Sequence, residues 1–424
     1  MVIGSGSTTE FIYEEQVYGY CLEAFDKYNL ANKRVLAVIP DHSRTAPIDM
    51  MFRVVYKIFA DRVKALDFLI ALGTHPPMTD EAINQRVGIT QNERVTRYSK
   101  ANFFNHQWKD GNQLKVIGTI SEDEVSEISS DLMKQKVDVT INKMVFDYDT
   151  LIIIGPTFPH EVVGFSGGNK YFFPGIAGQE IIDMFHWLGA LITNQEIIGK
   201  KETPVREVVN KAASFLPMQR ICCSLVVKGN DLSGIYIGTP EQAFSAAADL
   251  SDKIHITYKP EPFKSVLSCA PTMYDDIWTG GKCMYKLEPV VADGGELIIY
   301  APHITKISVS HGEIIEKIGY HVRDYFVKQM DKFKDIPAGV MAHSTHVKGI
   351  GSYENEKEKP RIKVTLSTQI PREVCDRINL GYYDPQKINT NEWKNREDEG
   401  ILLVEKAGEI LYRLDDLSKV VAIE

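Results

Sequence analysis

The sequence predicts an α/β protein with two domains. Short β-branched runs alternate with longer amphipathic stretches, and several of the runs are apolar along their whole length. Such runs are typical of parallel strands that helices cover on both faces. The chain has 424 residues, which exceeds what one hydrophobic core usually organises, so two domains are expected.

The first half of the chain is expected to contain a β-α-β unit. Strands are predicted at Arg34–Pro40, Ala65–Leu72 and Thr150–Gly155, and apolar residues recur at helical spacing over Asp49–Phe59. The loops that follow such strands are where α/β proteins bind ligands. The earlier residues Gly4–Thr9 are small and polar, and we expect them to be a flexible lead-in.

The second half repeats this alternation. One or two helices are expected over Gly312–Lys334, and another helix begins at about Lys282. The highly charged stretch Tyr353–Arg361 is expected to be a solvated loop. Further strands are predicted at Ser265–Cys269, Glu296–Tyr300, Ile362–Leu366 and Ile401–Glu405.

Two prolines suggest where the domains divide. Pro260 and Pro262 make Ile254–Phe263 the best candidate for a linker. We therefore expect an N-terminal α/β domain over residues 1–260 and a C-terminal α/β domain over residues 261–424.

The composition is that of an ordinary soluble globular protein, with 44% hydrophobic and 25% charged residues. A net charge of −9 argues against broad binding to nucleic acid or to anionic membranes. No apolar run is long enough to span a bilayer, and no signal-peptide pattern is visible. The six cysteines lack CxxC spacing, so we expect reduced thiols in a cytoplasmic protein.

Polar groups follow the first predicted strand in the run Asp41-His42-Ser43-Arg44. Asp and Ser at a strand end commonly cap the next helix, but that interpretation leaves Arg44 unexplained. A guanidinium at a helix entrance suits a carboxylate or phosphate, which it holds through two parallel hydrogen bonds.

His75 follows the second predicted strand, in the turn Gly73-Thr74-His75-Pro76-Pro77. A single histidine in a turn is usually structural. Here it lies on a βα loop whose backbone two prolines stiffen, which favours a role as general acid or base.

The densest group of polar residues and glycines runs from His160 through Lys170 to His186. Its glycines permit close backbone approach, but the pattern fits neither GxGxxG nor the P-loop. Lys170 is either a surface lysine or an amine whose apolar neighbours lower its pKa and favour covalent chemistry. His186 alone is more often structural.

A fourth group lies in the second half, at Trp278-Thr279-Gly280-Gly281-Lys282. Lys282 is either an exposed lysine at a helix start or a second cation that faces a cleft between the domains.

Together these groups resemble the lactate racemase family, whose members use a nickel-pincer nucleotide. The resemblance covers about residues 34 to 300 and is most specific in the motif H-x4-FSGG-[RN]-K-x3-PGIA-x8-H. The matching residues are Asp41–Arg44 with a delayed proline at Pro47, Thr74–Pro76, His160 to His186 with the spacings intact, and Trp278 to Lys282.

The resemblance implies a cofactor, pyridinium-3,5-bisthiocarboxylic acid mononucleotide, together with nickel. Lys170 would hold the nucleotide covalently, and His186 would complete nickel coordination by two sulfurs and a carbon of the cofactor. Other proteins would make the nucleotide and insert the nickel. Further cofactor contacts would come from Asp41, Ser43, Arg44, Ser166, Gly167 and Gly168.

The resemblance also implies the reaction, inversion at C2 of a 2-hydroxy acid. His75 and His160 would move the hydroxyl proton while the C2 hydrogen passes reversibly to the cofactor as hydride, through a planar 2-keto acid. Arg44 and Lys282 would neutralise the substrate carboxylate or a nearby phosphate. The site would lie in the cleft between two α/β domains.

The sequence departs from the lactate enzymes near the substrate. Trp278-Thr279 replaces a Tyr-Gln pair, and the glycines that follow suggest less bulk. His343 and His346 belong to a polar segment without an obvious counterpart, and a second metal site there is a weak alternative. We therefore expect Trp278, Thr279 and Lys282 to bind a sugar acid, such as a gluconate-like aldonate.

Three alternatives stay open at this point. Trp278 would also suit lactate, malate or an aromatic 2-hydroxy acid. A non-catalytic sugar-acid-binding protein would not need Lys170, His186 and both acid/base histidines together. A nicotinamide-dependent dehydrogenase is disfavoured because no GxGxxG follows a strand.

Overall fold

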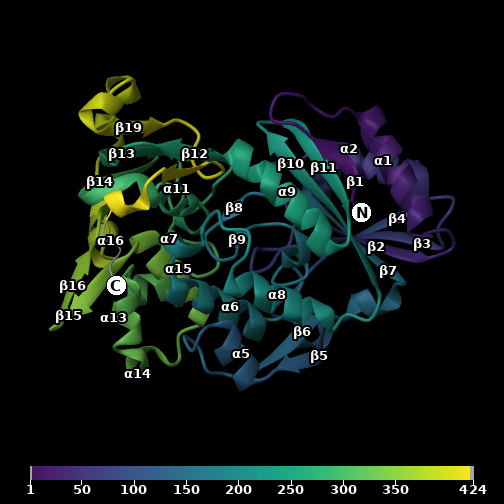
Figure 1. The fold of residues 1–424 in the computed structure, drawn as a ribbon, viewed down its shortest axis with the longest axis horizontal. Coiled ribbons are helices and arrows are strands. Elements are labelled where there is room, and N and C mark those ends of the chain that lie inside the picture. The colour runs from purple at the N-terminus through teal and green to yellow at the C-terminus, as the bar shows by residue number, and fades with distance from the viewer. Residues whose placement is uncertain (1, 421–424) are drawn as a thin grey trace. The chain divides into compact units, whose positions relative to one another are not determined.

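A computed structural model describes residues 2–420 and shows two compact units, each built from three segments of the chain (Figure 1). Unit 1 comprises residues 1–158, 165–182 and 201–254. Unit 2 comprises residues 159–164, 183–200 and 255–424. The sequence predicts one change of domain near residue 260, whereas the chain also passes into unit 2 twice before its last crossing, so His160 and His186 belong to unit 2.

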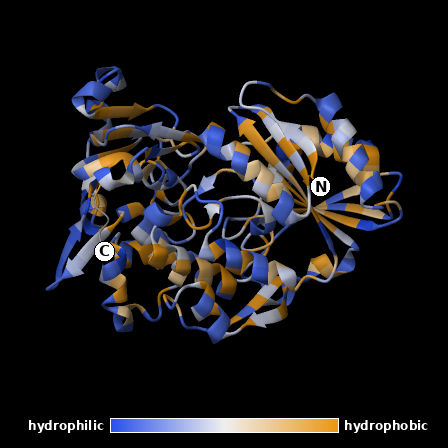
Figure 2. Ribbon diagram, viewed as in Figure 1, coloured by the Kyte–Doolittle hydropathy of each residue, from blue (hydrophilic) through white to orange (hydrophobic). Residues whose placement is uncertain are grey.

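Unit 1 is built on a seven-stranded sheet in the order β1-β11-β10-β7-β2-β3-β4. The five strands from β10 to β4 are parallel, and β11 and β1 complete the sheet in antiparallel pairing. Figure 2 shows these strands largely in the hydrophobic colour. Their bounds are β1 (Ile3–Gly6), β2 (Arg34–Pro40), β3 (Ala65–Ala71), β4 (Ala101–Asn105), β7 (Thr150–Pro156), β10 (Gln219–Lys228) and β11 (Asp231–Gly238).

The expectation of a flexible lead-in at Gly4–Thr9 is wrong for its first residues. Ile3–Gly6 pair with β11 from Ile237 to Gly234, so the chain start adds an edge strand to the sheet. The free hydrogen-bonding edge of β11 explains this pairing, because it offers partners to any extended segment that reaches it.

The helices of unit 1 bury their apolar faces against this sheet. α2 (Ile48–Phe59) packs beside α1 (Glu14–Lys27), and its Phe52 ring lies 5.2 Å from that of Phe68 in β3. The remaining elements are α3 (Asp80–Val87), α4 (Gln91–Val95), β5 (Leu114–Ile120), α5 (Glu122–Ile128), β6 (Val137–Asn142), α8 (Pro204–Ser214) and α9 (Pro240–His255).

The order of the strands creates a switch point at β2. From β2 the chain builds outward through β3 to β4, and it then returns to the other side of β2 with β7 and β10. The connections after β2 and β7 therefore diverge, and ligands of doubly wound sheets bind outside the carboxyl ends of such strands. Asp41 and Thr157 directly follow these two strands.

Unit 2 is built on a five-stranded, fully parallel sheet in the order β18-β17-β14-β13-β19. The α/β prediction is therefore confirmed. Its strands are β13 (Phe263–Cys269), β14 (Val291–Ala301), β17 (Lys363–Thr368), β18 (Gly381–Tyr382) and β19 (Ile401–Val404). Its helices include α6 (Gln179–Ile192, from Asp183 on), α7 (Asn194–Ile197), α10 (Ile277–Gly280), α11 (Lys282–Tyr285) and α15 (Ala338–Lys348).

Three local predictions in the second half need correction. The expected linker contains a strand, β12 (Ile256–Lys259), which pairs with β20 (Leu411–Leu414). The expected solvated loop is a hairpin of β15 (Gly351–Glu354) and β16 (Lys357–Pro360), because Asn355 and Glu356 take the positive φ angles of a tight turn. The stretch Gly312–Lys334 holds three helices: α12 (Gly312–Ile318), α13 (Arg323–Val327) and α14 (Met330–Phe333).

Within residues 2–420, no helix is both long and apolar enough to cross a bilayer. All six cysteines are free, and five of them are buried.

A buried histidine ties the PGIA segment of the long motif to unit 1. His106 Nε2 lies 2.9 Å from the Ala177 carbonyl, and its Nδ1 lies 3.3 Å from the side-chain amide of Asn142. The amide orientation is fixed because Asn142 Oδ1 accepts from the Met144 backbone amide. The neutral ring with its proton on Nε2 satisfies both contacts, and burial lowers the pKa of His106 to about 4.

This histidine predicts a loss of stability in mild acid. The unfolded chain takes up a proton at His106 near its usual pKa of 6.5, whereas the folded chain does so only near pH 4. The stability that the neutral His106 ring contributes is therefore fully present above pH 6.5. As the pH falls to 4, the free energy of unfolding declines by up to about 3 kcal/mol. Urea unfolding of wild type and His106→Gln between pH 4 and 7 checks this, and equal pH slopes in the two proteins would contradict it.

Candidate functional site

The carboxyl ends of β2 and β3 bring Asp41 and His75 together. Asp41 is 4% exposed, and its Oδ2 lies 2.5 Å from His75 Nδ1. Its Oδ1 accepts the Ser43 backbone amide at 3.0 Å and the Ser43 hydroxyl at 2.6 Å. Both carboxylate oxygens are thus occupied, so the aspartate is fixed in position.

This arrangement keeps Asp41 negative and orients His75. Burial alone would raise the pKa of Asp41, but the charge and hydrogen bond of His75, the Ser43 hydroxyl and the charge of Arg44 outweigh it. The pKa of Asp41 therefore lies well below its usual range. With Nδ1 of His75 donating to the carboxylate, Nε2 is the ring atom that can exchange a proton with a ligand.

Arg86 holds the loop that carries Arg44. Its guanidinium donates to the Arg44 carbonyl at 2.8 Å and to the Pro40 and Ala46 carbonyls at 3.4 Å. Burial lowers the pKa of Arg86. The charges of Arg44 and Arg86 both act on the buried Tyr171, which follows Lys170 directly. Arg44, Tyr171 and Asp41 therefore lie near one another within unit 1.

The loop before Lys170 depends on two glycines and one buried arginine. Gly167 has φ +94° and ψ 176°, and Gly168 has φ +58°. Arg206, only 1% exposed, donates to the Gly167 carbonyl at 3.0 Å and to the Phe165 carbonyl. Its guanidinium also lies 3.9 Å from the Phe244 ring centroid. Burial lowers the pKa of Arg206 to about 9, so it still carries its charge at neutral pH.

Lys170 itself is half-buried in the short helix η3 (Gly168–Tyr171). Ser166, predicted to contact the cofactor, accepts the Phe158 backbone amide at 2.9 Å and lies 3.4 Å from the Pro156 carbonyl. Its hydroxyl thereby fastens the loop to the end of β7. Asn169 donates to Asn210 and Glu241, which fastens the other side of the loop.

In unit 2, His160 ends the short strand β8 (Pro159–His160) and is 7% exposed. Its Nδ1 lies 3.1 Å from the Val162 backbone amide and 3.2 Å from Glu161 Oε2. His186 lies on α6 and is half-buried. Among residues 2–420, no three His, Cys, Asp or Glu side chains are grouped so that they could hold a metal ion by themselves.

Trp278 contacts two histidines that are far from it in sequence, His311 and His343. Its ring stacks on His343 with centroids 4.0 Å apart and lies 4.5 Å from His311. Asp276 fixes the start of this short helix, α10, by accepting the Thr279 and Val309 backbone amides, each at 2.9 Å. Burial lowers the pKa of His343, so its ring is neutral at neutral pH.

Gly281 has a different role from the one expected. A side chain there would not extend into open space, because a Cβ would lie 2.8 Å from Val347 and 3.3 Å from His343. The glycine lets α15 approach closely, and this approach brings His343 to Trp278. Lys282, which follows, is 8% exposed, and its ammonium lies 4.8 Å from the Tyr274 ring centroid.

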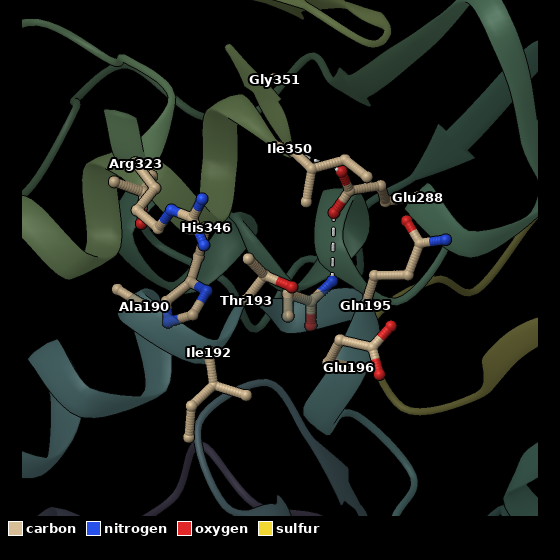
Figure 3. Close-up of a pocket in the computed structure, with 13 residues that line it drawn as sticks. Ala190, Ile192, Thr193, Gln195, Glu196, Glu288, Arg323, His346, Ile350 and Gly351 are labelled. Atoms are coloured by element: carbon tan, nitrogen blue, oxygen red, sulfur yellow. Dashed lines mark hydrogen bonds between the residues drawn. The ribbon is translucent and has the colours of Figure 1, made fainter. Parts of the chain in front are cut away.

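A separate polar cavity of about 120 Å³ lies within unit 2 (Figure 3). Glu288 is fully buried in its wall and accepts from the Ile350 backbone amide and the Asn194 side chain. His346 lies on another wall, and burial lowers its pKa to about 4 against the opposing effect of the Glu161 charge. His346, named above as a weak candidate for a second metal site, is in this wall, but no residue predicted to bind the cofactor or the substrate or to transfer protons lines the cavity.

The structure therefore groups the predicted residues in two sets, one in each unit. Asp41, Ser43, His75 and Arg44 belong with the Lys170 loop in unit 1. His160, His186, Trp278, Thr279 and Lys282 belong to unit 2. Four further residues of these two sets were not predicted from the sequence: Arg86, Arg206, Glu161 and His311. Only Glu161 has a local signal, its position directly after His160.

The fold and the site together define a class of protein. It is an α/β protein with a histidine–aspartate pair at the switch point of a sheet and a lysine on a glycine-rich loop. Residues 20–199 match the model of the lactate racemase N-terminal domain. The lactate racemase of Thermoanaerobacterium thermosaccharolyticum is 23% identical over 279 residues. That of Lactiplantibacillus plantarum is 26% identical over 160 residues. The N-terminal part of the chain, residues 20–199, therefore matches the lactate racemase family, to which the sequence motifs also point.

Two solved structures share the fold. A crystal structure of a Thermotoga maritima protein matches with a TM-score of 0.89 and 30% identity, over 97% of this chain and 100% of that one. The lactate racemase apoprotein of T. thermosaccharolyticum matches with a TM-score of 0.70 and 18% identity, over 97% and 94%. The sequence match to the T. thermosaccharolyticum racemase covers 63% of this chain and 60% of that enzyme. The match to the L. plantarum racemase covers 36% of this chain and 32% of that enzyme.

The residues present fit the nickel nucleotide by the chemistry of their donors. Lys170 offers a primary amine, which is what an amide or thioamide link to the nucleotide requires. Arg44, which follows the carboxyl end of β2, offers the cation that a phosphate group attracts. His186 offers one imidazole, and a single protein ligand suffices for nickel when the nucleotide supplies the others.

Replacing one glycine of the Lys170 loop, Gly167, is expected to lower the free energy of unfolding. In Gly167→Ala, the Cβ would meet Thr157 Oγ1 at 2.4 Å, and the backbone angles are nearly exclusive to glycine. We expect a loss of about 1–3 kcal/mol of unfolding free energy, measured with urea. Gly19→Ala is the matched control: nothing lies within 4 Å of its Cβ, and alanine in helix α1 should stabilise by about 0.5–1 kcal/mol. A Gly167→Ala protein as stable as wild type would contradict this account.

Proposed function

We propose that this protein is an isomerase that inverts C2 of a 2-hydroxy acid with a nickel-pincer nucleotide. The observation that carries the proposal is the intact motif from His160 through Lys170 to His186, together with the Asp41–His75 pair. The proposal includes a cytoplasmic location and proteins that make the cofactor and insert nickel.

The residues divide the work between holding the cofactor and moving protons. Lys170 would tether the nucleotide, and His186 would bind its nickel. Arg44 would neutralise a phosphate or carboxylate, while Ser43 acts through Asp41 and Ser166 through the loop backbone. When bound, the cofactor supplies a reversible acceptor for the C2 hydrogen as hydride.

The histidines supply the proton transfers that this reaction needs. A carboxylate beside C2 makes a carbanion unfavourable, so the hydrogen leaves more readily with both electrons while a base removes the hydroxyl proton. Nε2 of His75 is suited to that step because Asp41 holds Nδ1. His160 would serve the opposite face. Two imidazoles of opposite protonation state are required, one to accept the proton and one to return it.

The surroundings of Trp278 favour a sugar acid as substrate. Its ring lies against His311 and His343, and the chain offers Thr279 beside it. An aromatic face flanked by imidazole nitrogens suits a polyhydroxylated chain, whose C–H groups pack on the ring while its hydroxyls find polar partners. A short acid such as lactate or malate, or an aromatic 2-hydroxy acid, is the alternative substrate.

Intact mass spectrometry tests the central assignment. Protein produced together with the cofactor pathway should carry a covalent addition that Lys170→Ala lacks, and C2 inversion should be lost with it. Lys200→Ala is the matched control, an exposed lysine paired with Glu196 at 3.0 Å, and should keep both. Unmodified protein with full activity would overturn the proposal. Protein that binds sugar acids but inverts none would favour a non-catalytic binding protein.

A panel of 2-hydroxy acids tests the substrate. We expect kcat/KM to be higher for gluconate-like aldonates than for lactate or malate, and Trp278→Ala to lower it by about tenfold to a hundredfold. Inversion at C2 can be followed by chiral chromatography of the reaction mixture. Ready turnover of lactate with no turnover of any sugar acid would show that the substrate assignment is wrong.

A further inference from the structure

The polar cavity of unit 2 is lined by buried side chains with unsatisfied atoms (Figure 3). Among residues 2–420, Asn194 Oδ1, Gln195 Oε1 and His346 Nε2 have no hydrogen-bond partner, and all three side chains are buried. Folding removes such atoms from water, and buried polar groups in native proteins are nearly always satisfied. Three unsatisfied atoms on the residues that line one cavity therefore indicate a polar ligand inside it.

The free atom of Asn194 is an acceptor. Its Nδ2 donates to the Tyr285 carbonyl at 2.8 Å and to Glu288 Oε2 at 3.2 Å, and turning the amide over would set its oxygen against both of these oxygens. Gln195 adds a second amide oxygen. The His346 ring is neutral at neutral pH, because burial lowers its pKa to about 4, so it brings no positive charge. The unsatisfied atoms therefore suit a ligand that is a hydrogen-bond donor or a cation.

Glu288 brings a negative charge to the cavity. Its carboxylate is fully buried and accepts from two neutral groups, the Ile350 backbone amide at 2.7 Å and the Asn194 side chain, and within residues 2–420 it forms no ion pair. Arg323 also lines the cavity, but its guanidinium is paired with Asp324 at 3.0 Å. A buried carboxylate is stabilised by a partner of opposite charge, so the cavity favours a cation over a neutral donor.

The end of helix α6 adds partial negative charge. Ala190 and Ile192, at the C-terminus of this 14-residue helix, line the cavity. The last carbonyls of a helix lack partners within it and carry the negative end of its dipole. Thr193, which follows and also lines the cavity, has φ +88° and ψ 147°. That region is nearly exclusive to glycine, and a strained β-branched residue there is typical of a ligand site.

We propose that this cavity binds a monovalent alkali cation, Na⁺ or K⁺. Glu288 would balance its charge, and the amide oxygens of Asn194 and Gln195 would be ligands, beside water molecules that His346 helps to hold. The volume of about 120 Å³ leaves room for an ion with several water molecules. Carboxylate, amide and carbonyl oxygens are the donors that hard cations prefer.

Cations of higher charge fit the same cavity less well. Ca²⁺ sites usually gather several carboxylates, whereas the other glutamate in this wall, Glu196, is exposed and paired with Lys200 at 3.0 Å. A transition metal is disfavoured because, among residues 2–420, no three His, Cys, Asp or Glu side chains are grouped to hold one. The ion would connect the end of α6, which carries His186, to α15, which carries His343. None of its ligands takes part in the inversion of a 2-hydroxy acid, so the cation site and the proposed function are tested independently.

Thermal unfolding of the protein without cofactor tests the site. At equal ionic strength, KCl or NaCl should raise the melting temperature by about 2–4 °C above its value in tetramethylammonium chloride. Tetramethylammonium screens the net charge of −9 equally well, but its methyl groups keep oxygen ligands away from its charge. The chloride whose effect saturates at the lower concentration identifies the ion. The same melting temperature in all three salts overturns the proposal, and so does stabilisation by CaCl₂ alone.

Gln195→Met removes one ligand oxygen and nearly keeps the size of the side chain. The cation concentration at half saturation should then rise about tenfold. Gln386→Met, at an exposed glutamine of unit 2, is the matched control and should behave as wild type. Glu288→Gln should abolish the cation effect, but it also sets an amide donor against Ile350 or Asn194, so Gln195→Met decides the matter where that variant folds poorly. A Gln195→Met protein that responds to KCl and NaCl as wild type does overturns the proposal.

Discussion

The candidate site of unit 1 depends on one constraint, that β2, β3 and β7 run parallel and end at the same edge of the sheet. Pro40 pairs with Ala71 at the end of the β2–β3 ladder, so Asp41 and the turn that carries His75 leave the sheet side by side. This explains how residues 34 positions apart form a 2.5 Å contact. A register shift of one residue would turn every side chain of β2 to the other face and would move Asp41 out of line with the turn that carries His75.

The Lys170 loop adds a second constraint, because a glycine-rich segment does not hold a shape by itself. Gly167 and Gly168 adopt angles that cost other residues energy, and glycine pays for that freedom in conformational entropy. Arg206 offsets this through bonds to two loop carbonyls, while Ser166 and Asn169 fasten the loop to β7 and to its neighbours in unit 1. Burying a guanidinium is costly, and hydrogen bonds to carbonyl oxygens are what make it tolerable.

Elements and site residues could be predicted from the sequence where they are marked by a pattern of neighbouring residues. Strands β2, β3 and β7 were predicted because they are continuous apolar runs, and the family motif was found because its spacing is intact. Arg206 was missed because it lies 39 residues beyond the carbonyl that it binds, and nothing near it in the chain signals that contact. Likewise, β1 pairs with a strand more than two hundred residues away, and Gly281 owes its presence to α15, so neither was accessible to local reasoning.

The contrast between the two histidines shows how one residue type can be fixed in one place and switchable in another. At His75 the acceptor is a buried aspartate whose own bonds leave it one arrangement, so the ring keeps one tautomer. At His160 a backbone donor and a partly exposed carboxylate compete for the same nitrogen, so neither state is favoured by geometry alone. Inversion of a stereocentre needs acid and base on opposite faces, but it does not need them to be supported alike. A histidine that reaches water directly can exchange its proton there and requires only orientation, whereas a buried one exchanges its proton with water less readily.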